Sequence, residues 1–166
     1  MILGRWMVLA VASVGFSSFL PYRLVPFAKW KGGGFIGSLA GWALLMALPN
    51  VGGVYWAATV LILASCVPVC HYAEKFLGNH DDPRIIYDEV AGMWVSALFL
   101  PKDVWTLALA FVFFRLFDVL KGPWGRWASR APGGWGVAGD DLVAGLLANV
   151  FVRLSLSLFP QFLVPR

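Results

Sequence analysis

The sequence predicts an all-α integral membrane protein, a helical bundle of about six helices of which several span the bilayer. Of the 166 residues, 60% are hydrophobic and only 13% are charged, about half the charge of an average soluble domain. Six apolar stretches follow one another, separated by connections that hold most of the glycine, proline and charge. This composition excludes disorder, and so small a chain could not bury this much apolar surface in water.

The first half of the chain holds three apolar stretches. The first, Trp6–Leu20, and the second, Phe35–Leu48, are shorter than the about 20 residues that a spanning helix needs. The third, Val51–Cys70, is long enough, and Pro68 within it predicts a kink. We expect helices because a segment in lipid must satisfy its own backbone hydrogen bonds.

The second half repeats this mixture of short and long stretches. The fourth, Val90–Leu100, is short, whereas the fifth, Val104–Leu120, and the sixth, Leu142–Phe159, are long enough to cross. We expect the short stretches to be tilted, interfacial or partly buried in the bundle. The whole of residues 1–166 then forms a single membrane domain.

Three long connections, residues 21–34, 74–89 and 121–141, carry most of the polar side chains. If the crossings alternate, these connections lie on one side of the membrane, and their cations favour the cytoplasmic side. The net charge is +4 and the cations are scattered, so a nucleic-acid partner is excluded and anionic lipid is favoured. The sequence gives no oligomeric state.

Two adjacent acidic pairs, Asp88-Glu89 and Asp140-Asp141, are predicted to open apolar helices. Capping of the helix N-terminus explains either pair alone. However, both segments read Asp-x-Val-Ala-Gly, with the glycine one helical turn after Asp88 or Asp141. A bare glycine lets another helix or a bound group come close. We therefore expect two similar helix starts that face a shared site.

Carboxylates that crowd together repel one another unless a cation lies between them. Mg²⁺ prefers oxygen ligands and is commonly shared between carboxylates and a substrate phosphate. The sequence therefore predicts a Mg²⁺ site whose ligands are Asp88, Glu89, Asp140 and Asp141.

Zinc would need histidine or cysteine ligands. Cys66 and Cys70 can be two buried apolar residues, a metal pair with His71, or a disulfide. His80 lies in an acidic loop and is either solvated or a proton carrier.

Arg115, Asp118 and Lys121 follow at i, i+3 and i+6 and share one side of the fifth helix. They form either an internal ion pair with a lysine at the interface or a clamp for phosphate. A glycine-rich segment that includes Gly34 and Ser38 precedes the second helix, where backbone N–H groups can hold phosphate oxygens or simply make a turn. A second such segment, residues 133–136, precedes Asp140.

The known nucleophile motifs of covalent phosphatases are absent, and so is a Walker loop. The residues favour attack on phosphorus by a water that a metal activates.

Three blocks, residues 82–93, 114–121 and 133–145, resemble the phosphatidylglycerophosphatase A family in order and spacing. The resemblance implies a helical, Mg²⁺-dependent phosphatase of the bacterial inner membrane that converts the phospholipid phosphatidylglycerophosphate to phosphatidylglycerol and inorganic phosphate. It also implies a role in that site for Asp88, Glu89, Arg115, Asp118, Lys121, Asp140 and Asp141.

The chain departs from the family pattern at two places. The family loop before the second helix reads Pro-Gly-Thr-x-Gly-Ser, whereas residues 33–38 lack the proline and have Phe35 for the threonine. Gly122 stands where the family commonly has proline. These changes leave a different lipid phosphomonoester open as substrate.

We predict catalytic roles for Asp88, Glu89, Asp118, Asp140 and Asp141, and substrate binding by Arg115, Lys121, Gly34 and Ser38. Three other functions stay open. A transporter or ion pathway also uses acidic groups within the membrane. A non-catalytic subunit of a membrane complex would tolerate loss of those groups, and a lipid phosphotransferase would share the metal chemistry.

Overall fold

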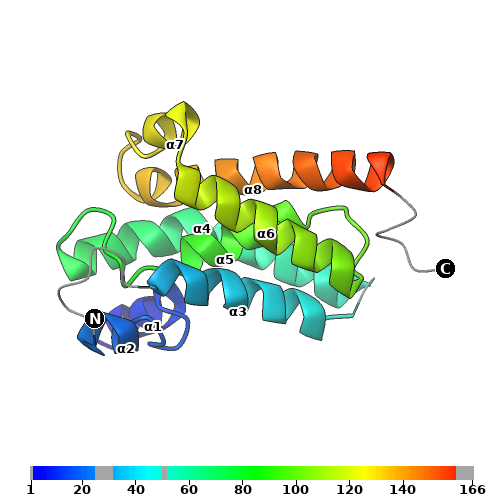
Figure 1. Cartoon of the computed structure of the whole chain (residues 1–166). Helices are drawn as coiled ribbons and strands as arrows, with labels where there is room; N and C mark the ends of the chain where they lie inside the picture. The colour runs from blue at the N-terminus through cyan, green and yellow to red at the C-terminus, as the bar shows by residue number, and fades with distance from the viewer. Residues whose placement is uncertain (1, 25–31, 50–51, 160–166) are drawn as a thin grey trace.

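A computed structural model describes residues 2–24, 32–49 and 52–159, and these residues form helices without any strand. The helices are α1 (Ile2–Ala12), α2 (Phe19–Leu24), α3 (Gly33–Ala47), α4 (Gly53–Leu77), α5 (Tyr87–Ser96), α6 (Val104–Leu120), α7 (Pro123–Ala128) and α8 (Gly134–Leu158). The long helices run side by side around α5 (Figure 1). The predicted all-α bundle is confirmed.

Helices α3 and α6 coincide closely with the second and fifth predicted stretches. Helix α4 continues seven residues beyond its predicted end, and α8 begins eight residues before its predicted start. Among the described helices, these two are long and apolar enough to cross a membrane. Each has 25 residues, about 37 Å of helix. The kink expected at Pro68, which lies within α4, stays a prediction.

The prediction of one helix over Trp6–Leu20 is wrong. Helix α1 ends at Ala12, and the backbone then turns through Val14, Gly15 and Phe16, which have φ values of 49°, 68° and 63°. Residues other than glycine rarely adopt positive φ values of this kind. Hydrogen bonds at the turn, among them one from the Phe16 N–H to the Ser13 hydroxyl, hold the turn. Ser13, Gly15, Ser17 and Ser18 lie at this break. They are the local signal for a turn that the apolar residues around them concealed.

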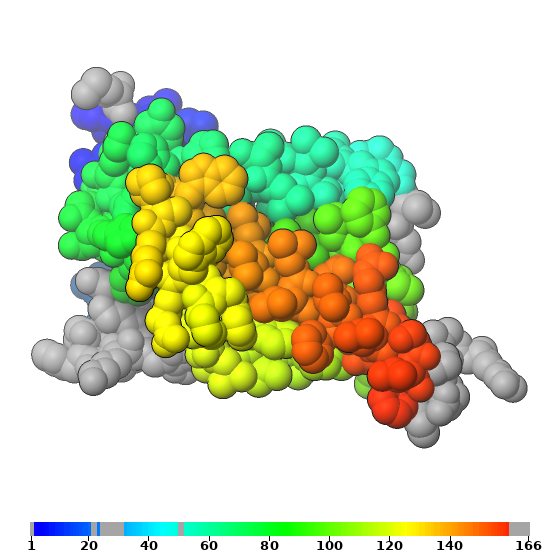
Figure 2. Space-filling model, turned by 90° about the horizontal axis from the view of Figure 1, so that it is seen from above, coloured from blue at the N-terminus to red at the C-terminus, as the bar shows by residue number. Residues whose placement is uncertain are grey.

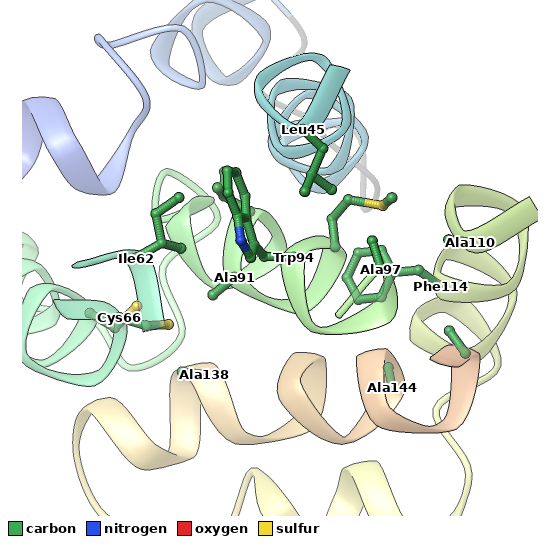
Figure 3. Packing of buried hydrophobic residues seen from close by; sticks show 14 of the residues in the cluster. Leu45, Ile62, Cys66, Ala91, Trp94, Ala97, Ala110, Phe114, Ala138 and Ala144 are labelled. Carbon is green, nitrogen blue, oxygen red and sulfur yellow. The ribbon is translucent and has the colours of Figure 1, made fainter. Parts of the chain in front are cut away.

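Helix α5 forms the centre of the bundle. It has only ten residues, and all seven from Val90 to Ser96 are buried. Trp94 lies between Leu45 of α3 and Ile62 of α4 (Figure 3), and its indole N–H donates to the Thr59 hydroxyl at 2.9 Å. At about 15 Å, α5 is too short to cross a bilayer.

The C-terminal end of α5 lies against α8, which satisfies its free carbonyl groups. The side-chain amide of Asn149 donates to the carbonyl oxygens of Val95, Ser96 and Leu98 at 3.3, 3.1 and 2.9 Å. Such partners let a helix end inside an apolar bundle without unpaired polar groups.

Glycines allow α3 to lie close to α5. Gly33, Gly37 and Gly41 recur at every fourth residue, so they share one side of α3. A Cβ on Gly37 would lie 3.1 Å from the Glu89 Cβ, and one on Gly41 would lie 3.1 Å from the Met93 Cβ. Small residues at such spacing bring helix backbones together in membrane proteins.

The outer surface of the bundle is apolar. Exposed side chains include Val60 and Leu61 of α4, Val112 of α6, and Leu146 and Val150 of α8. Figure 2 looks down on α8, with α4 along one side, α6 along the other and α7 over its start. A monomer in water rarely exposes so much apolar surface, whereas lipid solvates it. The protein is therefore a helical membrane protein.

Candidate active site

A cavity of about 340 Å³ opens at one end of the bundle. Its walls come from the start of α3, the segment before α5, the start of α5, the end of α6 and the first half of α8. Eight of the predicted site residues line it: Gly34, Asp88, Glu89, Arg115, Asp118, Lys121, Asp140 and Asp141.

Three carboxylates meet in this cavity. One oxygen atom each from Asp88, Glu89 and Asp141 lies within 4.8 Å of the other two. Asp88 and Asp141 are buried, with 5% of each residue exposed. In each acidic pair the first carboxylate accepts the backbone N–H of the second residue, at 3.1 Å for Glu89 and 3.2 Å for Asp141. The shared site predicted from the repeated motif is therefore formed by α5 and α8.

The acidic pairs differ in their place on the helix. Asp88 and Glu89 lie in the first turn of α5, as predicted. Because α8 begins at Gly134, Asp140 and Asp141 lie about two turns inside it, so the expectation that they open a helix is wrong. Capping of an N-terminus therefore does not account for the second pair.

The three carboxylates fit a small divalent cation. Glu89 Oε2 is buried without a hydrogen-bond partner within the described part of the chain. Two further buried acids face it, and carboxylate oxygens are the ligands that Mg²⁺ prefers. An uncompensated cluster of this kind would repel itself strongly. A cation is therefore the simplest partner for these side chains.

Asp140 lies beside this group of three and is paired with a cation of the chain. Its Oδ2 atom accepts a hydrogen bond of 2.7 Å from the Lys121 ammonium. Burial by itself would lower the pKa of Lys121, but the bond to Asp140 and the neighbouring acids outweigh it and raise this pKa. Lys121 therefore stays protonated at the wall of the cavity.

Arg115 of α6 also lines the cavity and is held there by two side chains. Its Nη1 atom lies 2.6 Å from Asp118 Oδ2 and donates to the Ser38 hydroxyl at 3.0 Å. That hydroxyl in turn donates to the Gly34 carbonyl oxygen at 2.8 Å. The internal ion pair that the spacing allowed is therefore present, and it faces the cavity, so the ion pair and the predicted clamp are compatible. Ser38 contacts the site through Arg115.

The glycine at position 34 brings α3 against the acids. A Cβ there would overlap Glu89 Oε1 and lie 3.4 Å from Arg115 Nη1. Only glycine leaves both groups in place, so this residue shapes the wall that the sequence assigned to phosphate binding.

One acidic residue of the cavity was not predicted. Asp81 lines it, with a φ of 49° that is unusual for a residue other than glycine. Desolvation by the cavity wall raises the pKa of the otherwise exposed Asp81, and the nearby Lys121 partly opposes this. The spacing of Asp81 from the other acids gives no sign that it belongs to the site. Its place there depends on the turn that the backbone makes at Asp81 itself.

The histidine and cysteine side chains near this end of the bundle do not join the acidic cluster. His80 is not among the residues that line the cavity, and it pairs with Glu74. Cys66 and Cys70 are free thiols, so a disulfide is excluded. The group of three acids is the one metal-type cluster among the described residues, and neither His71 nor a cysteine belongs to it.

A model of the family described as phosphatidylglycerophosphatase A matches residues 7–156. The chain belongs to this family. It is 39% identical to phosphatidylglycerophosphatase A of Escherichia coli K12 over 153 residues, which cover 86% of this chain and 78% of the relative. The protein of that name from Haemophilus influenzae Rd is 32% identical over 120 residues, 70% of this chain and 74% of the relative.

A further relative comes from Bacteroides thetaiotaomicron and carries the provisional name phosphatidylinositol-3-phosphatase. It is 28% identical over 135 residues, which cover 78% of this chain and 84% of the relative. No solved structure matches the chain.

The match to the phosphatidylglycerophosphatase A family confirms the resemblance read from the three sequence blocks, all of which lie within residues 7–156. The predicted charged residues of those blocks are the ones that meet in the cavity.

Proposed function

We propose that the chain hydrolyses phosphatidylglycerophosphate to phosphatidylglycerol and inorganic phosphate, with Mg²⁺ as its cofactor. The observation that carries this proposal is the cavity that holds the buried Asp88 and Asp141, the half-buried Glu89, and the two cations Arg115 and Lys121. Membership of the phosphatidylglycerophosphatase A family supports the lipid substrate.

The acids of the cavity divide into two kinds. Asp88, Glu89 and Asp141 are the proposed metal ligands, because their oxygens converge and Glu89 Oε2 has no other described partner. Mg²⁺ held by these residues would neutralise phosphate charge and lower the pKa of an attacking water. Asp140 holds the Lys121 ammonium instead of joining the group of three.

The two cations bind the phosphate in different ways. Arg115 offers a planar guanidinium that can bind two phosphate oxygens at once, and Asp118 and Ser38 fix its orientation. Lys121 adds a compact charge. Asp118 thus acts on the substrate through Arg115.

We further propose a multi-pass protein of the bacterial inner membrane with its site toward the cytoplasm. The residues that line the cavity come from three long connections and the helix ends beside them, and these gather at one end of the bundle. The positive-inside tendency favours the cytoplasm for these cation-bearing connections. A cysteine introduced at the exposed Arg126 should react with an impermeant reagent in inside-out vesicles and resist it in right-side-out ones.

The first experiment is phosphate release from phosphatidylglycerophosphate by the protein in detergent, with Mg²⁺ and with EDTA. Release that requires Mg²⁺ supports the proposal, and no release by folded protein contradicts it. Phosphatidylinositol 3-phosphate is the second substrate to assay, because one relative carries that name. Metal-independent ion flux in liposomes would instead favour the transporter.

A further inference from the structure

One residue of the cavity wall is also exposed on the apolar outer surface of the bundle. Val119 of α6 lines the charged cavity, yet 65% of it is exposed. Its neighbour Leu120 is 63% exposed, and Leu116 is 45% exposed. The rim of the cavity on α6 is therefore apolar on its outer side, whereas Arg115 and Asp118 form its inner side.

The seam between α3 and α6 is closed on the other side of Arg115. Phe35 of α3 packs edge-to-face against Phe111 of α6, with ring centres 5.7 Å apart. Phe111 lies one turn before Arg115, and Val119 lies one turn after it. The ring pair thus closes the seam between α3 and α6 toward the middle of the bundle. The cavity lies beyond this pair, at the end of the bundle. The two helices lie side by side (Figure 1).

A second cavity, of about 320 Å³, offers no such route. It is lined by apolar residues of α1, α3, α5 and the turn after α1, among them Val11, Leu44 and Val90. None of its lining residues lines the charged cavity. A lipid tail in it would have no described path to Arg115.

We propose that the lipid substrate reaches the site sideways from the bilayer, between α3 and α6, with its glycerol and first acyl carbons against Val119 and the Phe35–Phe111 pair. This inference rests on the proposed function. The charged phosphate must stay out of the hydrocarbon while the acyl chains remain in it, so a site for this substrate needs a wall that is charged inside and apolar outside. The α6 rim has that character. Val119 then selects lipid phosphates over soluble ones.

The test compares two valines of α6. Val119 and Val112 are seven residues apart, so they lie on the same face of the helix, and they are 65% and 59% exposed. Only Val119 lines the cavity. Each is replaced by serine, and kcat/KM is measured for dioleoyl phosphatidylglycerophosphate in micelles and for its dibutyryl analogue as a monomer in water.

We take the ratio of kcat/KM for the dioleoyl lipid to kcat/KM for the dibutyryl analogue. We expect Val119→Ser to lower this ratio about 10-fold, mainly by raising KM for the long-chain lipid. Val112→Ser should leave this ratio within about twofold of the wild-type value. An unchanged ratio for Val119→Ser, or an equal fall for Val112→Ser, overturns the route. A wild-type protein that hydrolyses neither substrate overturns the proposed function and the route with it.

A second measurement does not depend on turnover. A photoreactive phenylalanine analogue at position 119 should cross-link to a radiolabelled lipid phosphomonoester, and unlabelled phosphatidylglycerophosphate should compete. The same group at position 112 should capture bulk lipid without such competition. Capture at 119 that unlabelled substrate does not reduce contradicts the proposal.

Discussion

Gly92 of α5 and Gly145 of α8 lie against each other in the centre of the bundle. The Gly92 carbonyl oxygen occupies the space that a Cβ on Gly145 would need, and a Cβ on Gly92 would lie 2.7 Å from the Asp141 carbonyl oxygen. These are the two glycines of the repeated Asp-x-Val-Ala-Gly motif. The contact therefore sets the separation of α5 and α8, and with it the approach of Asp88 to Asp141.

Gly145→Ala should destabilise the protein, because the new methyl group would overlap backbone that cannot rotate away. We expect a loss of about 1–3 kcal/mol, the usual cost of overpacking, and a fall in activity as the two acids move apart. Gly139→Ala is the control on the same helix, since its Cβ would meet its nearest neighbour at an ordinary 3.4 Å. Thermal unfolding in detergent checks both, and equal stability of the two variants would contradict the packing argument.

Ser38→Ala should weaken phosphate binding without removing a charge. The Ser38 hydroxyl accepts a hydrogen bond from Arg115 and donates one to Gly34. Its loss frees the guanidinium to rotate, which should cost about 1–2 kcal/mol, or roughly 5- to 30-fold in kcat/KM. Ser155→Ala is the matched control, because that hydroxyl bonds only to the carbonyl one turn before it, far along α8. Steady-state kinetics distinguish the two, and an unchanged kcat/KM for Ser38→Ala would show that Arg115 needs no such support.

The chemistry of the site could be predicted because charge is rare in this chain and stands out. Asp88 and Asp141 were found through a repeated motif, and Arg115 and Asp118 through their helical spacing. These signals are local, and the fold preserves them. Pairing across the site is not local: nothing in the sequence indicates that Lys121 would bond to Asp140.

Helix boundaries were harder to predict where glycine has a packing role. Gly134 and Gly136 suggested a loop, yet both lie in the first turn of α8. A Cβ on Gly134 would overlap the Val67 carbonyl oxygen of α4. Gly134 therefore permits close packing of α8 against α4, whereas Gly136 makes room for the connection after α7. Only the tertiary structure distinguishes these roles from a turn.

Asp141→Asn should remove the response of the protein to Mg²⁺ while leaving it folded. A ligand that binds only the native state raises the melting temperature, so Mg²⁺ should stabilise the wild type and have little effect on this variant. Activity should fall about 100-fold or more. Asp103→Asn is the control, since Asp103 caps the start of α6 and is not among the cavity-lining residues. A Mg²⁺-dependent shift of normal size in Asp141→Asn would exclude Asp141 as a ligand.

Asp82 should stabilise the fold in a pH-dependent way. Burial alone would raise its pKa, but hydrogen bonds from Arg84 and Asn79 outweigh burial and leave the pKa below its usual value. Three of these bonds come from Arg84, two of them at 2.7 Å. A carboxyl whose pKa is lowered by folding contributes stability above its unfolded pKa of about 3.9 and loses it as the pH falls through the folded value.

Asp82→Asn should therefore lower the free energy of unfolding by about 1.5–3 kcal/mol at neutral pH. This deficit should stay constant down to about pH 5 and shrink below about pH 4, where the wild-type carboxyl is protonated as well. Asp81→Asn is the adjacent control, because the hydrogen bonds from Asn79 and Arg84 go to Asp82 and not to Asp81. Asparagine also tolerates the left-handed backbone at this position. Unfolding midpoints of the three proteins across this pH range decide the matter. At low pH the side chain at position 82 is uncharged in the wild type and in Asp82→Asn. A deficit that persists there would mean that the charge of Asp82 is not what stabilises the fold.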